Sequence, residues 1–342
     1  MISLNDLPIA ALIAFVVAAA LCRLVIAFGP RDAPDGARKD QPRPTPTSGG
    51  LAIALSMALS LVFVFRTTPP DLMILGASLG AVAALLLGFA DDVWDLPPRV
   101  KLALQMLIAC GLAAAGVRAE TLEPGFDRIR ELSPLVGGFF AIIWLIVLMN
   151  AVNFMDGANG LAMGMASFAA MGLAGAATLA GELELLMFCG AMVGALWGFL
   201  VWNVRGKLFA GDAGAFCVAA GLGAASLLLV RARPDMMFVP LIVLSPFLVD
   251  VFLTLIWRAR RGERLFEAHR DHVYQIALKA GLKHWQMSMA HWVFAANCAA
   301  LGFAAAAIGG EAGLVIFIGV TLMGAWVHVR IRRAALTTGL IA

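Results

Sequence analysis

Long apolar runs alternate with short polar stretches along the whole chain. A helix needs about 20 mostly apolar residues to cross the hydrocarbon core of a bilayer, and about eleven runs approach or exceed that length. The predicted helices cover residues 7–29, 49–66, 72–90, 101–117, 135–152, 160–180, 184–202, 213–231, 236–257, 287–308 and 312–329. The pattern therefore predicts an all-α, polytopic integral membrane protein with about eleven transmembrane helices.

The composition agrees with this class. The chain is 61% hydrophobic and 14% charged, whereas a soluble domain is about half apolar and about a quarter charged. No polar stretch is long enough for a second domain, so we expect residues 1–342 to form a single membrane-embedded domain, surrounded by membrane lipids and without a nucleic-acid partner. The five cysteines all fall in apolar runs, which favours buried thiols over disulfides or a zinc site. The first run lacks the basic start and the cleavage site of a signal peptide and is predicted to be a retained helix.

The basic residues predict how the chain is threaded, because cytoplasmic loops carry an excess of Lys and Arg. They gather in the first loop, in the loop after the ninth run and near the C-terminus. The residues are Arg31, Arg38, Lys39 and Arg43, then Arg258, Arg260, Arg261, Arg264, Arg270, Lys279 and Lys283, then Arg330, Arg332 and Arg333. With an odd number of crossings, this distribution predicts an N-terminus outside and a C-terminus in the cytoplasm.

The same threading places five polar motifs on the cytoplasmic side. They are Pro42–Gly50, the pair Asp91 and Asp92, Asn153–Gly160, Asn203–Asp212, and His269–His272. Apart from Arg43 and Arg270, the basic residues named above lie outside these motifs. The presence of all five motifs on one side therefore supports a single polar site at the membrane surface.

Carboxylates and basic groups together at a membrane surface suit a divalent cation held against a diphosphate. Mg²⁺ binds through one or two carboxylates together with substrate phosphates, and it neutralises the charge that develops during phosphoryl transfer. The candidate metal ligands or bases are Asp91, Asp92, Asp156 and Asp212. The candidate phosphate partners are Lys101, His269, Arg270 and His272.

Each motif alone has a plainer interpretation. An acidic pair after an apolar run is usually a helix end in water, and Asp-Gly is usually a turn. A secondary transporter is an alternative function, since intramembrane acids mark ion paths, although transporters hold such acids near the bilayer midplane. A phosphotransferase of the CDP-alcohol type is another, but its Asp-rich helix motif is not found in the sequence.

The ordered set of motifs resembles a known family, the polyprenyl-phosphate N-acetylhexosamine-1-phosphate transferases of glycosyltransferase family 4. The resemblance runs from about residue 40 to about residue 285. It rests on Pro44–Gly50 (PTPTSGG), Gly88–Asp92 (GFADD), Asn150–Gly157 (NAVNFMDG), Phe209–Asp212 (FAGD) and His269–His272 (HRDH). Together, in this order and spacing, these motifs are highly specific.

The resemblance implies a helical enzyme of the bacterial plasma membrane with a cytoplasmic active site. Such enzymes transfer a sugar 1-phosphate from a UDP-N-acetylamino sugar to undecaprenyl phosphate, release UMP, and require Mg²⁺ or Mn²⁺. By position, Asp212 matches the metal-binding aspartate, and Asp91 and Asp92 match a pair assigned to metal binding or to activation of the lipid phosphate. The substrate-binding matches are Asn153 and Asp156 in the nucleotide-sugar motif, Asn203 and Phe209 near the uracil, and Lys101 near the diphosphate.

The late basic loop indicates the branch of the family. The muramoyl-pentapeptide branch typically carries three consecutive histidines here, whereas this chain has His269-Arg270-Asp271-His272, followed by Val-Tyr-Gln. That resembles the branch that starts O-antigen of lipopolysaccharide and related envelope glycans with GlcNAc or a 6-deoxy amino sugar. One departure is Asn159, where many members have Asp.

Glycines spaced four apart, as at Gly190 and Gly194, allow close helix packing within the protomer or in a homodimer.

Overall fold

The predicted helical architecture is confirmed. The computed structural model describes residues 2–29, 31, 32, 45–125, 128–264 and 270–341. The helices are α1 (Asp6–Phe28), α2 (Gly49–Val64), α3 (Leu72–Trp94), α4 (Pro98–Ala114), α5 (Pro134–Met155), α6 (Leu161–Ala180), α7 (Leu183–Asn203), α8 (Gly211–Ala232), η1 (Pro234–Met236), α9 (Phe238–Val243), α10 (Ser245–Arg260), α11 (Val273–Lys279), α12 (His284–Ile308) and α13 (Ala312–Thr337). Two short antiparallel pairs, β1 (Arg31–Asp32) with β2 (Thr45–Pro46) and β3 (Thr121–Leu122) with β4 (Arg130–Glu131), lie in loops.

The protein is a multi-pass membrane protein. Within the described residues, eight helices are long and apolar enough to cross a bilayer, or nine if α9 and α10 together form one broken span. α2 has only 16 residues and α4 only 17. The predicted number of about eleven crossings is therefore not confirmed by helix length, although a helix or a broken pair occupies each predicted run.

The ninth run is bent rather than continuous. The sequence predicted one helix over residues 236–257, but the chain turns by 69° between the α9 and α10 segments. Pro246 lies in the first turn of α10. It has no N–H to donate to the carbonyl of residue 242, and its ring would clash with that carbonyl in a continuous helix. The bend directs α10 toward α13, against which it packs.

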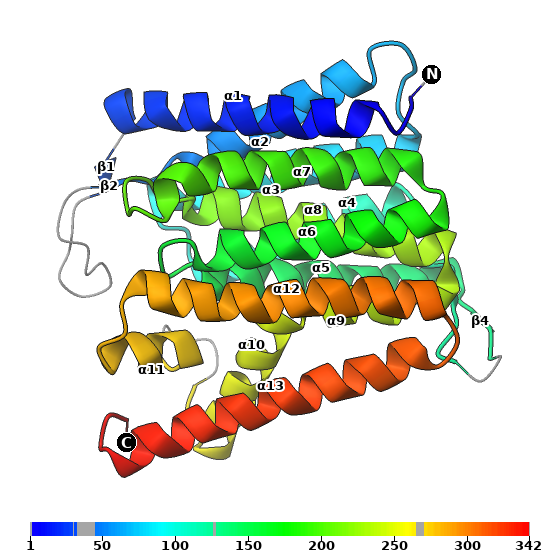
Figure 1. The fold of residues 1–342 in the computed structure, drawn as a ribbon. Helices are drawn as coiled ribbons and strands as arrows, with labels where there is room; N and C mark the ends of the chain where they lie inside the picture. The colour runs from blue at the N-terminus through cyan, green and yellow to red at the C-terminus, as the bar shows by residue number, and fades with distance from the viewer. Residues whose placement is uncertain (1, 30, 33–44, 126–127, 265–269, 342) are drawn as a thin grey trace.

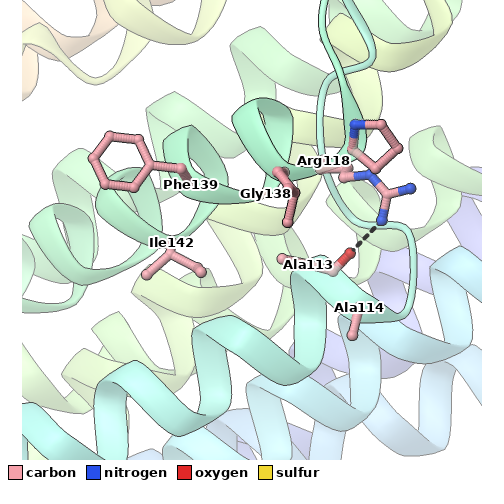
Figure 2. Close-up of a pocket in the computed structure, with 8 residues that line it drawn as sticks. Ala113, Ala114, Arg118, Gly138, Phe139 and Ile142 are labelled. Carbon is pink, nitrogen blue, oxygen red and sulfur yellow. Dashed lines mark hydrogen bonds between the residues drawn. The ribbon is translucent and has the colours of Figure 1, made fainter.

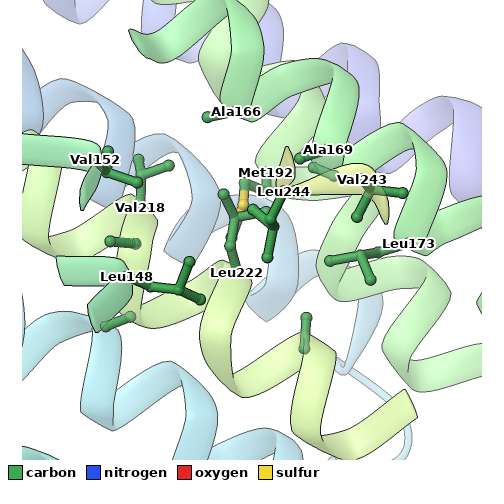
Figure 3. Close-up of a cluster of buried hydrophobic side chains, with 14 of the residues drawn as sticks. Leu148, Val152, Ala166, Ala169, Leu173, Met192, Val218, Leu222, Val243 and Leu244 are labelled. Carbon is green, nitrogen blue, oxygen red and sulfur yellow. The ribbon is translucent and has the colours of Figure 1, made fainter. Parts of the chain in front are cut away.

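The helix α8 is the centre of the bundle. Residues 213–230 are buried throughout, because α2, α3, α5, α6 and α7 all pack around this helix. Figure 3 shows part of that core, with Met192 of α7 and Leu222 of α8 at the centre of the view, Leu148 and Val152 of α5 on one side and Leu173 of α6 on the other. A helix enclosed on all sides is fixed in position, and so is any polar group at its end.

The polar motifs lie at one end of this bundle. In Figure 1, β1, β2, α11 and the C-terminus lie at the left end, whereas the N-terminus and β4 lie at the right. Consecutive long helices alternate in direction, so α3 and α5 end, and α8 begins, at the left. The groove between α4 and α5 in Figure 2 lies at the other end, where the Arg118 guanidinium donates a 2.8 Å hydrogen bond to the Ala113 carbonyl.

We predict that Gly88→Ala destabilises the protein. A β-carbon at this position of α3 would lie 2.2 Å from the backbone oxygen of Asp212, so one of the two helices must shift. Such overpacking costs about 1–3 kcal/mol, which thermal unfolding of the detergent-solubilised protein would detect. Gly111→Ala in α4 is the matched control, because no atom lies within 4 Å of its added β-carbon. Equal unfolding temperatures for the two variants would contradict the prediction.

Candidate active site

Asp92 fastens the end of α3 to the start of α8. Its Oδ1 accepts a 3.0 Å hydrogen bond from the backbone N–H of Asp212, and its Oδ2 accepts one of 3.2 Å from that of Ala213. These donors belong to the first turn of α8, where backbone N–H groups have no partner within the helix and where the helix dipole favours negative charge. The Asp92 carboxylate therefore caps α8 from a neighbouring helix.

Asp91 lies between a cation and a second acid. Its Oδ2 forms a 2.8 Å ion pair with the Nζ of Lys101, and its Oδ1 accepts a 2.9 Å hydrogen bond from the Leu96 N–H. Its carboxyl group is also in hydrogen-bonding contact with that of Asp212. The structure thus brings together four residues predicted from the sequence, Asp91, Asp92, Lys101 and Asp212, although they come from three helices.

The proline-rich motif and the Phe209–Asp212 motif are joined through their backbones. The N–H of Gly49 donates to the Phe209 carbonyl at 3.0 Å, and the N–H of Phe209 donates to the Pro46 carbonyl at 2.9 Å. Gly211 has φ +71°, and a β-carbon there would lie 2.5 Å from Oδ2 of Asp92. Glycine is therefore required at this position for two reasons, the left-handed backbone and the close approach of Asp92.

Asp156 follows α5 and lies beside the acidic cluster. Burial raises the pKa of its carboxyl well above the usual range, and the negative charge of Asp92 raises this pKa further. Next to it, the Tyr274 hydroxyl occupies the space that a side chain at Gly157 would need, since a β-carbon there would lie 2.1 Å from the Tyr274 oxygen. That hydroxyl donates to the Phe154 carbonyl at 3.1 Å, and burial raises its pKa, with the nearby charges of Asp250 and Asp156 adding to the effect.

Asn203 connects two motifs rather than standing open at the surface. Its Oδ1 accepts a 2.7 Å hydrogen bond from the Gly160 N–H, and its Nδ2 donates to the Leu208 carbonyl at 2.8 Å. The side chain is buried. Phe209, which directly follows Leu208 in the chain, is half-buried. Contact of Asn203 and Phe209 with a uracil stays a prediction.

The late basic loop reaches the Asn153–Gly160 motif through His272. The His272 side chain is only 2% exposed, and its ring centroid lies 5.9 Å from that of Phe154. Arg270 is exposed, and its carbonyl accepts a hydrogen bond from Lys279. Asn153 is half-buried, and its carbonyl accepts the N–H of Asp156 at 3.1 Å. His269 lies outside the described residues.

Sequence reasoning missed a second buried cluster behind this loop. It contains Asp250 and Thr254 of α10 and His328 and Arg332 of α13. Asp250 was the available clue, since a lone acid within an apolar run needs a partner. The partners on α13 lie far away in sequence and could not be identified from the pattern.

The donor set fits a hard cation such as Mg²⁺. In the part of the chain that the structure describes, no three His, Cys, Asp or Glu side chains are placed to bind one ion. The oxygens of Asp92 face backbone donors, which leaves the adjacent carboxylates of Asp91 and Asp212. When both are ionised, two adjacent carboxylates outweigh one ammonium group, and a cation would balance the remaining negative charge. Mg²⁺ commonly uses one or two carboxylates together with substrate phosphates. Metal binding by Asp91, Asp92 or Asp212 stays a prediction.

Comparisons with known proteins identify the family of this chain. Residues 74–230 match the model of glycosyl transferase family 4. A probable undecaprenyl-phosphate N-acetylglucosaminyl 1-phosphate transferase of Bacillus subtilis is 24% identical over 210 residues, which are 60% of this chain and 59% of the relative. A phospho-N-acetylmuramoyl-pentapeptide-transferase of Rubrobacter xylanophilus is 34% identical over 177 residues, 46% of this chain and 52% of the relative. The corresponding transferase of Desulforudis audaxviator is 31% identical over 259 residues, 68% of this chain and 74% of the relative.

The protein is thus a polytopic membrane protein. The chain belongs to glycosyl transferase family 4, which confirms the resemblance seen in the motifs. The match spans 59% and 52% of the length of the first two relatives.

We predict that Asp156→Asn lowers the activity of the protein without lowering its stability at neutral pH. A carboxyl whose folded pKa is raised stabilises the fold in its protonated form, and this contribution is lost as pH rises from about 4 through the folded pKa. The variant should therefore unfold at an equal or higher temperature than the unmodified protein at neutral pH, with the difference shrinking in acid. Transferase turnover should fall by roughly a hundredfold or more, as when a charge that stabilises the transition state is removed.

The measurements are unfolding temperature against pH and initial rate at saturating substrate. Asp95→Asn is the control, since Asp95 is an exposed acid at the same end of the molecule, in a left-handed conformation that Asn tolerates. A destabilised Asp156→Asn at neutral pH, or one with normal turnover, would show that the Asp156 charge has another role.

Proposed function

We propose that this protein transfers the 1-phosphate of an N-acetylamino sugar from a UDP-sugar to undecaprenyl phosphate. The observation that carries the proposal is the acidic cluster of Asp91, Asp92 and Asp212 beside Lys101, held where α3 ends and the enclosed helix α8 begins. These acids lie at helix ends rather than at mid-helix, which favours a phosphotransferase over a secondary transporter.

The proposed reaction is a direct displacement at phosphorus. A phosphate oxygen of the lipid attacks the β-phosphorus of the UDP-sugar, and the bond from that phosphorus to the oxygen bridging it to the α-phosphate breaks. UMP leaves, and a lipid-linked diphosphate sugar remains. The lipid phosphate is already anionic near neutral pH, so positioning and charge neutralisation supply most of the acceleration.

The residues divide this work according to their contacts. Asp212 and Asp91 would hold Mg²⁺ or Mn²⁺, which when bound supplies charge neutralisation at the diphosphate. Lys101 adds a positive charge beside Asp91. Asp92 holds α8 in register through two backbone N–H groups, and Asp156 closes the site on the side of α5 with Asn153. Arg270 is exposed and can reach a donor phosphate.

We propose UDP-GlcNAc or a UDP-6-deoxy-N-acetylamino sugar as the donor, and an envelope glycan such as O-antigen as the product's destination. The basis is the loop His269–Gln275, which lacks three consecutive histidines. Within this loop, Gln275 accepts a 3.1 Å hydrogen bond from the His272 N–H and donates one of 3.2 Å to the Tyr274 hydroxyl. The B. subtilis relative is named for N-acetylglucosamine, whereas the R. xylanophilus and D. audaxviator relatives are named for the muramoyl pentapeptide.

The test is transfer of labelled sugar phosphate to undecaprenyl phosphate by the purified protein with Mg²⁺. We expect product from UDP-GlcNAc or a UDP-6-deoxy-HexNAc and none from the UDP-muramoyl pentapeptide. Asp212→Asn keeps the side-chain shape but removes one metal-directed charge, so turnover should fall by roughly a hundredfold or more.

Three outcomes would contradict parts of this proposal. Efficient use of the pentapeptide donor would show that the loop was misinterpreted. Near-normal Mg²⁺-dependent turnover in Asp212→Asn would remove Asp212 from the metal site. Absence of transfer from every UDP-sugar, with substrate-dependent uptake into vesicles, would favour a transporter.

We also propose that the end of the bundle bearing the site faces the cytoplasm, as the Lys and Arg distribution indicates. Arg264 and Arg128 are both exposed and lie in loops at opposite ends of the bundle. In intact cells, a membrane-impermeant thiol reagent should label Arg128→Cys and spare Arg264→Cys, with the reverse pattern showing the opposite orientation. The native Cys110 is exposed, so both variants are made in a Cys110→Ala background.

A further inference from the structure

The second buried cluster joins three separate parts of the chain behind the active-site loop. Asp250, Thr254 and Arg258 follow one another at successive turns of α10 and so lie on one face of that helix. His328 and Arg332 are likewise four residues apart on α13. All five side chains are buried, and between them lies the segment of Asp271 and His272.

Asp250 receives donors from two directions. Its Oδ1 accepts hydrogen bonds from the Val273 N–H at 3.1 Å and from the Thr254 hydroxyl at 3.2 Å. Two imidazoles also face it, with Nδ1 of His328 at 3.3 Å from Oδ1 and Nδ1 of His272 at 3.6 Å from Oδ2. One carboxylate is thus hydrogen-bonded to the start of α11 and faces the imidazoles of His272 and His328.

Arg332 provides the second connection. Its Nε donates to Nε2 of His328 at 2.7 Å, and its Nη2 donates to the Thr254 hydroxyl at 2.9 Å and to the backbone carbonyl of Asp271. Because arginine can only donate, His328 must accept at Nε2 and carry its hydrogen on Nδ1, the atom that faces Asp250. The Arg332 guanidinium also lies over the ring of Trp257, 4.3 Å from its centroid.

Arg258 completes the attachment of the loop. It forms ion pairs with the carboxylates of Asp271 and Glu263, and its Nη2 donates to the Arg264 carbonyl at 2.9 Å. The loop side of the cluster then meets the active site, because the rings of Phe154 and Tyr274 lie 5.9 and 6.2 Å from that of His272.

Burying several charges rarely increases stability as much as well-packed apolar residues would, and the best-attested use of such groups is to specify one arrangement. We propose that Asp250, His328 and Arg332 are positioning residues, which hold the segment Asp271–Tyr274 against the Phe154–Asp156 side of the active site. The C-terminal helix α13 then supports the active site indirectly, because it holds this segment in place. The kinetic consequence rests on the proposed function, whereas the positioning itself does not.

The test compares Arg332→Met with Arg333→Met in the full-length, detergent-solubilised protein. Both variants exchange one arginine of α13 for an unbranched apolar side chain, but Arg332 is buried in the cluster and Arg333 is exposed. Hydrogen exchange of the peptides covering residues 270–280 should become about tenfold faster in Arg332→Met alone, the factor expected for a lost hydrogen bond to a charged group. Peptides from the acidic cluster in α3 and α8 should exchange as before.

Steady-state kinetics provide the second measurement. In Arg332→Met, kcat should fall by about tenfold to a hundredfold, as expected for a loosely positioned site, and KM for the UDP-sugar should rise while KM for undecaprenyl phosphate stays unchanged. Arg332→Lys, which keeps a donor, should recover part of both changes. If Arg332→Met does not fold, Asp250→Asn replaces it, because this variant keeps the side-chain shape and removes the charge that the two histidines face.

Unchanged exchange in the loop, or equally faster exchange throughout the protein, would overturn the positioning role. An equal effect of Arg333→Met would do the same. If the unmodified protein transfers no sugar phosphate at all, the proposed function fails, but the exchange comparison still decides whether α13 holds the loop.

Discussion

The rest of the active site depends on the two hydrogen bonds from the start of α8 to the Asp92 carboxylate. The first turn of any helix has N–H donors without intrahelical partners, and neighbouring helices enclose α8 from residue 213 onward. A carboxylate from α3 satisfies two of these donors. The two helices also approach closely at Gly88 of α3. Because Asp92 caps α8, its neighbour Asp91 lies beside Asp212.

This arrangement explains why the adjacent acids have different surroundings. Successive residues of a helix point about 100° apart, so one carboxylate of the pair turns to α8 while the other turns to Lys101 on α4. The capping acid is committed to backbone donors. Its neighbour remains beside Asp212 in a contact that one shared proton or one cation would stabilise. Asp92 therefore has a structural role at this helix end, whereas Asp91 is left for the proposed metal and substrate.

The sequence predicted the helices well because each depends on a local property, the length of an apolar run. It also predicted that Asp91, Asp92 and Asp212 would meet, since loops on one side of a membrane must lie at one end of the bundle. It did not predict the break at Pro246, because an apolar run on either side of a proline is compatible with a kinked or a broken helix. Nor did it predict the pairing of Asp250 with His328, which depends on how α10 and α13 pack after the break.

One polar residue that the sequence predicted near the substrate, Asn203, binds the protein's own backbone through its side chain. Asn203 is fixed between Gly160 and Leu208, and the carbonyl of Gly160 in turn accepts a 2.8 Å hydrogen bond from the indole of Trp292 on α12. The segment between α5 and α6 is irregular, and two of its residues, Ala158 and Gly160, are buried. Each unpaired backbone group in such a place costs free energy of folding. Polar side chains from α7 and α12 therefore bind backbone groups of Asn159 and Gly160 in this segment. The sequence can therefore predict which charged groups gather at such a site, because charges interact at a distance. It predicts the partners of amide side chains less well, because these depend on where the backbone lies.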